Sequence, residues 1–407
     1  MGCNMDMSAV RNDFPTIRKG DGVYLDSACQ SLRPEQVIRV ISEYYENYPS
    51  CGGRSVHGMS AKVSMITDEA REKAAEFFGT DDPECYIFTK NCTEGINTVA
   101  RGFKFGKGNV VVTTDTEHNS NHVPWTILSE EIGIKRRYSK AKDDGEFNIE
   151  NFKKVMGKDV KLVSVHHASN VTGCVVPIKE ITEIAHDAGA KVLVDGSQAA
   201  PHMKVDLKKL DVDFYSLSIH KMLGPSGMGI LYGKKECLND LRPLTTGGGT
   251  VGLATYEHVS LAPVPDRFEA GLQNYSGIAG TKAALEYLTS LGMDKILEHD
   301  RALMRSIFKR TNEIEGLNII GPNDPDRRCG VFSFNIEGLS PHDVAMMLDK
   351  MDNIMIRSGM HCAHPFFVSK GIEGSARASV YLYNNEEDIK RFAKALCNVA
   401  ETFGDKR

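Results

Sequence analysis

Lys221 is the residue whose setting first suggests chemistry. It follows a short apolar run over residues 214–217 and precedes a segment, 224–229, that holds three glycines and a proline. This pattern predicts a strand, then the lysine, then a tight loop. A lysine held between a strand and a turn can form a Schiff base when burial or a neighbouring cation lowers its pKa. A solvated lysine on a surface hairpin would show the same local pattern, so the rest of the chain must decide.

Polar residues follow other apolar runs in the same way. The junction at Asn91, Cys92 and Thr93 comes after a strand predicted over residues 85–89 and opens a predicted helix. Free amides and a hydroxyl at a helix N-terminus can bind phosphate, although an ordinary Asn or Thr cap uses the same residues. His118 stands at the next such junction, where it could stack on a flat cofactor or merely satisfy a loop.

Asp195 ends a nearly all-apolar strand predicted over residues 191–194. A carboxylate at the end of a buried strand costs several kcal/mol unless a partner neutralises it, and a protonated pyridine nitrogen would be such a partner. Lys221 follows 26 residues later. The order of phosphate loop, stacking residue, carboxylate and lysine is the one that a pyridoxal 5'-phosphate (PLP) site requires.

The elements that would position these residues alternate in type. From residue 85 onward, predicted strands at 109–113, 162–166 and 191–194 are separated by predicted helices at 93–101, 123–132 and 178–188. This alternation predicts an α/β fold with a mostly parallel sheet flanked by helices. Ligands of such sheets bind beyond the carboxyl ends of the strands, where all these polar residues fall.

The length of 407 residues suits two domains. We expect a large cofactor-binding domain over residues 21–290 and a smaller α+β domain over residues 291–407, with residues 1–20 as an N-terminal segment packed on the small domain. The elements predicted in the small domain are helices at 293–314, 341–351 and 386–402 and strands at 330–336 and 354–358.

Composition narrows the classes of function. A hydrophobic content of 41% and a charged content of 25% are ordinary for a globular protein with a sizeable core. The net charge of −5 does not indicate a basic surface that would bind nucleic acid. Neither a membrane span nor a signal peptide is evident. The ten cysteines form no CxxC pair, which argues against a metal site or a redox dithiol. We therefore expect a cytoplasmic protein without metal, membrane or nucleic-acid partners.

Several motifs together resemble the class V aminotransferase group of fold type I PLP enzymes, and within it the Suf-type (group II) cysteine desulfurases, which are close to selenocysteine lyases. The similarity extends over nearly the whole chain. The motifs occur in the same order as in the family, which makes the resemblance specific. The motifs are YLDSA near residue 24, NCTEGINTVARG near 91, TEHNSNHVPW near 116, SNVTG near 169, KVLVDGSQA near 191, DFYSLSIHKMLGPSGMGILYG near 213, RFEAG near 267, RSGMHCAHP near 357 and SARASVYLYNNEED near 375.

The resemblance implies PLP as the cofactor and roles for four residues around its ring. Lys221 carries the cofactor as a Schiff base and later moves the proton at the substrate Cα. Asp195 pairs with the pyridine nitrogen, and Gln198 hydrogen-bonds the ring hydroxyl. His118 stacks on the ring and can act as acid or base on the substrate sulfur.

The resemblance also implies how the phosphate and the substrate are held. Arg377 pairs with the carboxylate of L-cysteine, for which a planar guanidinium is suited. Asn170 helps Arg377 and contacts the cofactor, and Arg357 is a further substrate-binding residue. The residues around the phosphate are Cys92, Thr93, Ser218 and His220.

Cys362 defines the reaction that the resemblance implies. In the family this cysteine attacks the substrate sulfur and keeps it as a persulfide while L-alanine is released. The thiolate is the nucleophile, and His361 and Arg357 could stabilise it. Only 14 residues separate Cys362 from Arg377, as in the short arm of group II. A short arm implies that an acceptor or scaffold protein docks to take the sulfur for iron–sulfur cluster or thio-cofactor assembly.

The family also implies a homodimer, and here Leu272 departs from its pattern. Related enzymes carry a threonine at this place that reaches the phosphate across the dimer interface, whereas leucine has no donor. Three alternatives stay open: a selenocysteine lyase, which shares nearly every residue named, another lyase or transaminase of the class V family, and a fold relative that acts only as a binding scaffold.

Overall fold

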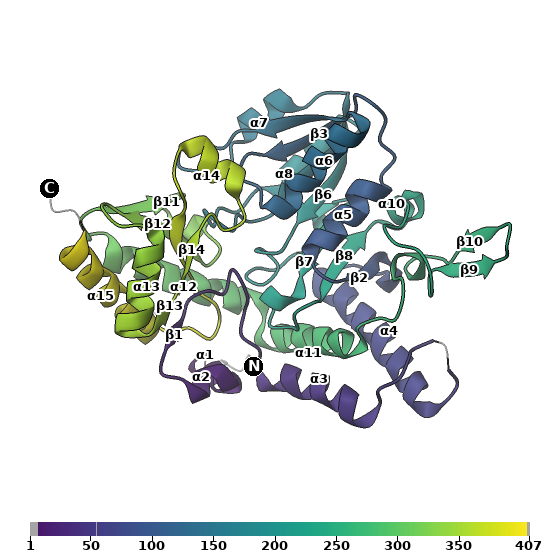
Figure 1. Ribbon diagram of the computed structural model, residues 1–407, viewed down its shortest axis with the longest axis horizontal. Coiled ribbons are helices and arrows are strands. Elements are labelled where there is room, and N and C mark those ends of the chain that lie inside the picture. The colour runs from purple at the N-terminus through teal and green to yellow at the C-terminus, as the bar shows by residue number, and fades with distance from the viewer. Residues whose placement is uncertain (1–6, 54, 405–407) are drawn as a thin grey trace.

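The computed structural model describes residues 7–53 and 55–404 as two sheets with their helices (Figure 1). Residues 1–6 of the predicted N-terminal segment and Arg54 lie outside the described residues. The larger sheet and its helices occupy residues between α3 (Glu35–Asn47) and α11 (Tyr275–Leu291). The smaller sheet and its helices follow from residue 293 onward.

The larger sheet has seven strands and is mostly parallel, which confirms the predicted fold class. Its strand order is β2-β8-β7-β6-β5-β3-β4, and only β8 runs antiparallel to its neighbours. The strands are β2 (Tyr86–Thr89), β3 (Val110–Thr114), β4 (Lys135–Ser139), β5 (Val160–His166), β6 (Lys191–Asp195), β7 (Phe214–Ser218) and β8 (Gly229–Gly233).

Helices cover both faces of this sheet because its strands are apolar on both sides. Val110 and Val112 of β3 pack in one core cluster, and Val111 packs in another on the opposite face, as the period of two requires. The flanking helices are α3, α4 (Gly58–Phe78), α5 (Cys92–Gly102), α6 (Val123–Ile132), α7 (Ile149–Val155), α8 (Ile178–Asp187), α9 (Leu207–Leu210), α10 (Lys235–Asp240) and α11.

The smaller sheet is antiparallel, with strand order β11-β12-β15-β14. Its core gathers Phe332, Phe334 and Phe392 with aliphatic side chains of the adjacent helices. The elements are α12 (Met293–Thr311), β11 (Leu317–Ile320), β12 (Val331–Ile336), α13 (Pro341–Asp352), β14 (Arg357–Gly359), α14 (His364–Lys370), β15 (Ser375–Ser379) and α15 (Glu386–Phe403).

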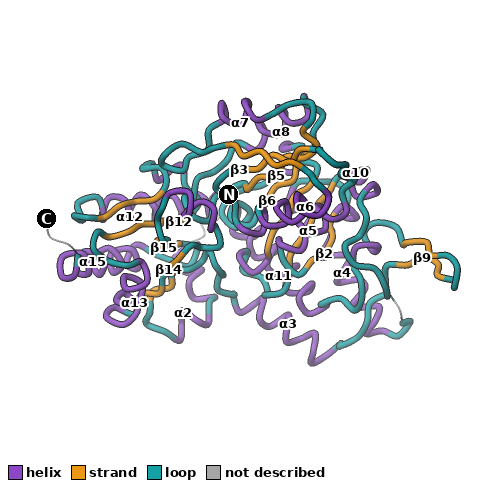
Figure 2. The backbone as a smooth tube through the Cα atoms, turned by 45° about the horizontal axis from the view of Figure 1, so that its top comes forward, coloured by secondary structure: helices purple, strands orange, loops and turns teal. Residues whose placement is uncertain are grey.

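The N-terminal segment contacts the small-sheet region. β1 (Val23–Tyr24) pairs in parallel with β13 (Ile354–Met355). Before it lie α1 (Met7–Val10) and α2 (Pro15–Lys19), and between them Arg11 Nη1 bonds Asp388 Oδ2 of α15 at 2.7 Å. In Figure 2 this segment lies beneath the boundary between the two sheets.

The remaining elements are short. Turns of 3₁₀ helix span Arg11–Asp13, Pro83–Cys85, Asn119–Asn121, Ile219–Lys221, Asp266–Phe268 and Pro325–Arg327. A hairpin of β9 (Val251–Ala254) and β10 (Val259–Leu261) projects from the large-sheet region, away from the rest of the molecule (Figures 1 and 2). Within the described ranges, no helix is both long and apolar enough to cross a membrane.

One predicted strand is divided in the structure. Residues 354–358 were expected to form a single strand, but β13 pairs with β1 and β14 pairs with β15 in a different sheet. The sheet partners therefore change within five residues, which a run of sequence alone does not reveal.

Candidate active site

The structure brings all the predicted site residues to one cavity of about 240 Å³. The cavity lies at the carboxyl ends of β2, β3, β5, β6 and β7, where it meets residues of the small-sheet region. The predicted residues that line it are Cys92, Thr93, His118, Asn170, Asp195, Gln198, Ser218, His220, Lys221, Arg357, Cys362 and Arg377. A larger cavity, of about 630 Å³, contains none of them.

Lys221 ends the 3₁₀ turn that follows β7, so the predicted strand, lysine and loop are present. Ser31 fixes the backbone on both sides of it. Ser31 N and Oγ donate to the His220 carbonyl at 3.0 Å each, and Leu223 N donates to Ser31 Oγ at 2.9 Å. Burial lowers the pKa of the Lys221 amine, Asp195 opposes this, and the charge of Arg377 adds to it. The amine is thereby made more nucleophilic.

Asp195 is the last residue of β6, and Gln198 lies on the turn that follows it. Ser197 N donates to Asp195 Oδ1 at 2.9 Å, and Gln198 Nε2 donates to the Ala28 carbonyl at 2.8 Å. Gln198 Oε1 and Ser197 Oγ are buried and have no hydrogen-bond partner among the described residues. Because buried polar atoms are normally paired, these two atoms indicate a ligand with polar groups in the cavity.

The residues of the predicted phosphate site converge at the start of α5. Asn91 caps this helix by accepting from Glu94 N at 3.0 Å. Cys92 N donates to Ser218 Oγ at 2.9 Å, and Thr93 Oγ1 lies 2.6 Å from Ser120 Oγ. The Cys92 thiol is buried, and burial raises its pKa well above the ordinary value, so it stays protonated.

His118 lies partly buried at the end of the loop after β3. Ser120 N donates to His118 Nδ1 at 3.1 Å, which leaves the proton of the neutral ring on Nε2. Burial, followed by the charge of Lys221, lowers the pKa of His118 to about 4. The imidazole is therefore neutral at pH 7 and can exchange a proton with a neighbouring group.

Arg377 projects from β15 and is almost fully buried. Its Nη2 lies 3.2 Å from Asp26 Oδ1, and its Nη1 donates to the Asn170 carbonyl at 3.0 Å. Its Nε is buried without a partner among the described residues. Two contacts thus orient the guanidinium, and further N–H donors, including that of Nε, are left for an anionic ligand.

Cys362 is exposed, on a turn with unusual backbone geometry. His361 and Cys362 have φ values of 47° and 55°, a left-handed conformation that is uncommon for residues with side chains. Two hydrogen bonds hold this turn. Asn119 N donates to the Cys362 carbonyl at 2.6 Å, and Asn170 Nδ2 donates to the His361 carbonyl at 2.7 Å.

The expectation that His361 stabilises the Cys362 thiolate is wrong. His361 is buried, and its Nε2 lies 2.9 Å from Ser375 Oγ. Burial, with the charges of Arg377 and Arg357, lowers the pKa of His361 to about 2, so the ring carries no positive charge at neutral pH. Its contribution is to hold the turn.

Three residues in or next to the cavity were missed by sequence reasoning. Asp26 pairs with Arg377, Cys29 Sγ accepts a hydrogen bond from Arg357 at 2.6 Å, and Ser120 contacts His118. Asp26 and Cys29 follow β1 within the stretch YLDSAC, directly after a predicted strand. Their position at a strand end was the available signal, but their partners lie more than 300 residues away. No cluster of His, Cys, Asp or Glu that could hold a metal ion occurs in the part of the chain that the structure describes.

The sequence and the fold of this chain were compared with those of known proteins, and they match one family. The model of the family described as Aminotransferase class-V matches residues 23–392. A probable cysteine desulfurase of Halalkalibacterium halodurans is 40% identical over 94% of both chains. The apo structure of the cysteine desulfurase of Thermococcus onnurineus is 35% identical, covers 98% of this chain and 100% of its own, and superposes with a TM-score of 0.94. The variant of C-DES in which glycine is covalently linked to the PLP cofactor shares the fold, with 22% identity over 97% of this chain and 99% of its own and a TM-score of 0.84.

Proposed function

The chain belongs to the class V aminotransferase family, and from this premise we propose that it is a PLP-dependent cysteine desulfurase. It converts L-cysteine to L-alanine and takes up the sulfur as a persulfide on Cys362. One observation carries the proposal: the exposed Cys362 thiol and the Lys221 amine, 141 residues apart in the chain, line the same small cavity.

The residues of the cavity fit PLP. The buried, unpartnered oxygens of Gln198 and Ser197 can bond polar groups of the ring, and the Asp195 carboxylate can pair with a protonated ring nitrogen. The start of α5, with Ser218 and His220, can hold the phosphate, and Lys221 can bind the cofactor covalently. When bound, PLP withdraws electrons from the substrate Cα, which makes its proton acidic.

Arg377 binds the carboxylate of the substrate. Its guanidinium is oriented by Asp26 and Asn170 before any ligand arrives, and its free Nε faces no competing acceptor in the described residues. Preorganised donors lose little entropy when the carboxylate binds. Arg357 supplies a second positive charge to the same end of the cavity.

Lys221 and His118 handle protons. Because burial lowers the pKa of Lys221, its amine can accept a proton from Cα and return it. His118 is neutral at pH 7 because burial lowers its pKa to about 4, and its Nε2–H can donate to the substrate sulfur. Neither group then needs a water molecule as intermediary.

Cys362 takes the sulfur. Its thiolate attacks the sulfur of the substrate, a sulfur–sulfur bond forms, and the bond from that sulfur to Cβ breaks with its electron pair left on carbon. The carbon then gains a proton, and L-alanine leaves. The exposure of Cys362 lets an acceptor protein reach the persulfide afterwards.

We also propose that the protein is a cytoplasmic homodimer. The hairpin of β9 and β10 exposes Val251, Leu253, Val259 and Leu261, with Tyr256 at its turn, far from the protein's own core (Figure 1). Such an apolar projection suits contact with a second copy. Leu272 is also exposed, and leucine has no donor for the phosphate contact that a threonine makes across the dimer interface in related enzymes.

We propose the functional division of the chain along the two sheets. Residues 21–290 hold the residues for the cofactor, residues 291–407 supply Arg357, Cys362 and Arg377, and the segment before residue 21 packs on the second part. The contact of Arg11 with Asp388 supports the packing of the segment before residue 21 on the second part. β1 (Val23–Tyr24), just after that segment, pairs with β13 and so also packs with the second part.

Mass spectrometry of the protein after treatment with L-cysteine tests the function. The expected result is a gain of one sulfur on the peptide that contains Cys362, together with formation of alanine. Cys362→Ser should abolish both, whereas Cys397→Ser, a matched change on the surface of α15, should abolish neither. Alanine formation that persists in Cys362→Ser would point instead to a lyase reaction that needs no protein thiol. Activity of that variant on selenocysteine alone would point to a selenocysteine lyase.

A further inference from the structure

Cys29 is a second thiol in the cavity of Cys362. Of the cysteines in the described ranges, three line this cavity: Cys29, Cys92 and Cys362. Burial raises the pKa of Cys92 well above its ordinary value and holds its thiol protonated, so it is not a nucleophile. Cys29 differs because it is only partly buried and opens on the cavity.

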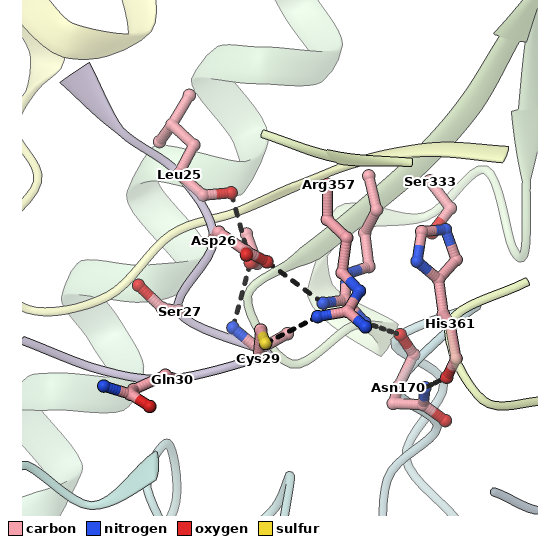
Figure 3. A network of polar contacts seen from close by, with 12 residues as sticks. Leu25, Asp26, Ser27, Cys29, Gln30, Asn170, Ser333, Arg357 and His361 are labelled. Atoms are coloured by element: carbon pink, nitrogen blue, oxygen red, sulfur yellow. Dashed lines mark hydrogen bonds and ion pairs between the residues drawn. The ribbon is translucent and has the colours of Figure 1, made fainter. Parts of the chain in front are cut away.

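Arg357 couples Cys29 to the segment that carries Cys362. Arg357 Nη1 donates to Cys29 Sγ at 2.6 Å (Figure 3), and Arg357 begins β14, five residues before Cys362. The guanidinium thus gives Cys29 Sγ a hydrogen-bond donor and a positive charge as its direct neighbour. The strand that leads to the nucleophile thus also holds the second thiol in place.

The backbone at Cys29 is equally well held. Cys29 N donates to the Asp26 carbonyl at 3.0 Å, and Gln198 Nε2 donates to the carbonyl of Ala28. The other end of the same Gln198 amide, Oε1, is buried without a partner among the described residues and lines the cavity. Cys29 therefore borders a space built for a polar ligand rather than a packed core.

We propose that Cys29 is a second sulfur carrier, which takes the outer sulfur of the persulfide from Cys362. This inference rests on the proposed function, because the persulfide is the sulfur donor. Both accessible thiols, those of Cys29 and Cys362, line this one cavity of about 240 Å³.

The transfer balances without an added oxidant. The Cys29 thiolate attacks the outer sulfur, and a bond from Cys29 Sγ to that sulfur forms. The bond from that sulfur to Cys362 Sγ breaks, and its electron pair leaves as the Cys362 thiolate. The result is a persulfide on Cys29 and a free Cys362, so the site can accept a second sulfur before an acceptor protein arrives.

Peptide mapping after a single exposure to L-cysteine tests the transfer. The protein loaded with PLP is mixed with L-cysteine labelled at sulfur, without acceptor protein or reductant, and quenched with an alkylating reagent. Trypsin separates the two thiols, since peptide 20–39 contains Cys29 and peptide 358–370 contains Cys362 as its one cysteine. Labelled persulfide is expected on both peptides, and the alanine formed in the first burst should be about twice that of Cys29→Ser.

The variants separate this inference from the proposed function. Cys29→Ser should keep labelled persulfide on Cys362, Cys362→Ser should lose it from both peptides, and Cys397→Ser should match the native protein. Label confined to Cys362 in the native protein, or a disulfide joining the two peptides, would overturn the role of Cys29 and leave the desulfurase intact. Label on Cys29 in Cys362→Ser would also overturn it. Absence of label from Cys362 in the native protein would instead reject the proposed function.

Discussion

Asp26 and Arg377 are 351 residues apart in the sequence, yet Asp26 Oδ1 lies 3.2 Å from Arg377 Nη2. The pair joins the turn after β1 to the strand β15. Burial raises the pKa of Asp26, and Arg377 counteracts this by favouring the charged carboxylate. The buried guanidinium therefore has a partner while the substrate carboxylate is absent, and its orientation is set in advance.

Arg377→Lys should raise the KM for L-cysteine and lower kcat/KM by about 10- to 100-fold. Lysine keeps the charge but cannot bond Asp26, Asn170 and a carboxylate in one plane. Steady-state rates of alanine formation measure the effect. Arg391→Lys, a matched change on α15 where the arginine bonds two backbone carbonyls, should leave KM unchanged. An equal KM in both variants would remove Arg377 from the substrate site.

Lys221→Ala should abolish covalent attachment of PLP and lower kcat by about 10³-fold or more, because both the amine and the proton carrier at Cα are lost. Borohydride treatment of the native holoenzyme should trap the cofactor on the peptide that contains Lys221. In the variant the cofactor should be removable by gel filtration. Lys208→Ala, on the surface beside Asp81, is the control. Cofactor trapped elsewhere in the variant would contradict the assignment.

His118→Asn should lower kcat by about 10²- to 10⁴-fold, the usual contribution of a positioned acid or base. Burial lowers the pKa of His118 to about 4. In the native enzyme, the fall of kcat toward acid pH that this residue causes should therefore be centred near pH 4. In the variant this fall should be absent. Rates of persulfide formation between pH 4 and 8 provide the profile. His122→Asn, four residues on and outside the cavity, should keep the native profile. An equal loss of kcat in His118→Asn and His122→Asn would indicate that the substitutions disturb the structure of the loop.

His167 predicts how stability depends on pH. Burial, followed by the charge of His166, lowers the pKa of His167 to about 4 in the folded protein, below the ordinary value of about 6.5. The unfolded chain then binds the additional proton as pH falls from 6.5 to 4, and unfolding becomes easier by about 1.4 kcal/mol per pH unit for this group.

Urea unfolding at several pH values measures this slope. His167→Gln should be less stable at pH 7, because Tyr215 loses a hydrogen-bond partner, but its stability should decline less steeply toward pH 5. His342→Gln, which removes an exposed histidine, should keep the native slope. An unchanged slope in His167→Gln would show that the ring is not held neutral by burial.

Strong local patterns account for what the sequence predicted well. The helix expected at 123–132 is α6, and the apolar runs at 191–194 and 214–217 are β6 and β7, because long apolar or periodic runs must be buried. The polar residues after these strands fall together since parallel strands share one carboxyl edge. These regularities are local, and they were enough to predict most of the residues that line the cavity.

What could not be predicted depends on tertiary neighbours. β15 reads Ser-Ala-Arg-Ala-Ser, without the bulky residues that signal a strand, and it is buried only because two strands flank it. β4, with two arginines and a lysine, lies at a sheet edge. The neutrality of His361 follows from burial by distant segments, as do the pairs of Arg377 with Asp26 and Arg357 with Cys29.

The hairpin of β9 and β10 gives a prediction about assembly. Leu253→Ser combined with Tyr256→Ser should weaken the proposed dimer, raising its Kd by about tenfold or more, because exposed apolar side chains dominate such contacts. Light scattering during gel filtration, over a range of protein concentrations, measures the change. The far-UV circular dichroism spectrum should stay native, since both side chains are exposed in the protomer. Val368→Ser, an exposed apolar residue of α14, is the matched control. A double variant whose mass equals that of the native protein at every concentration would exclude this hairpin from the interface.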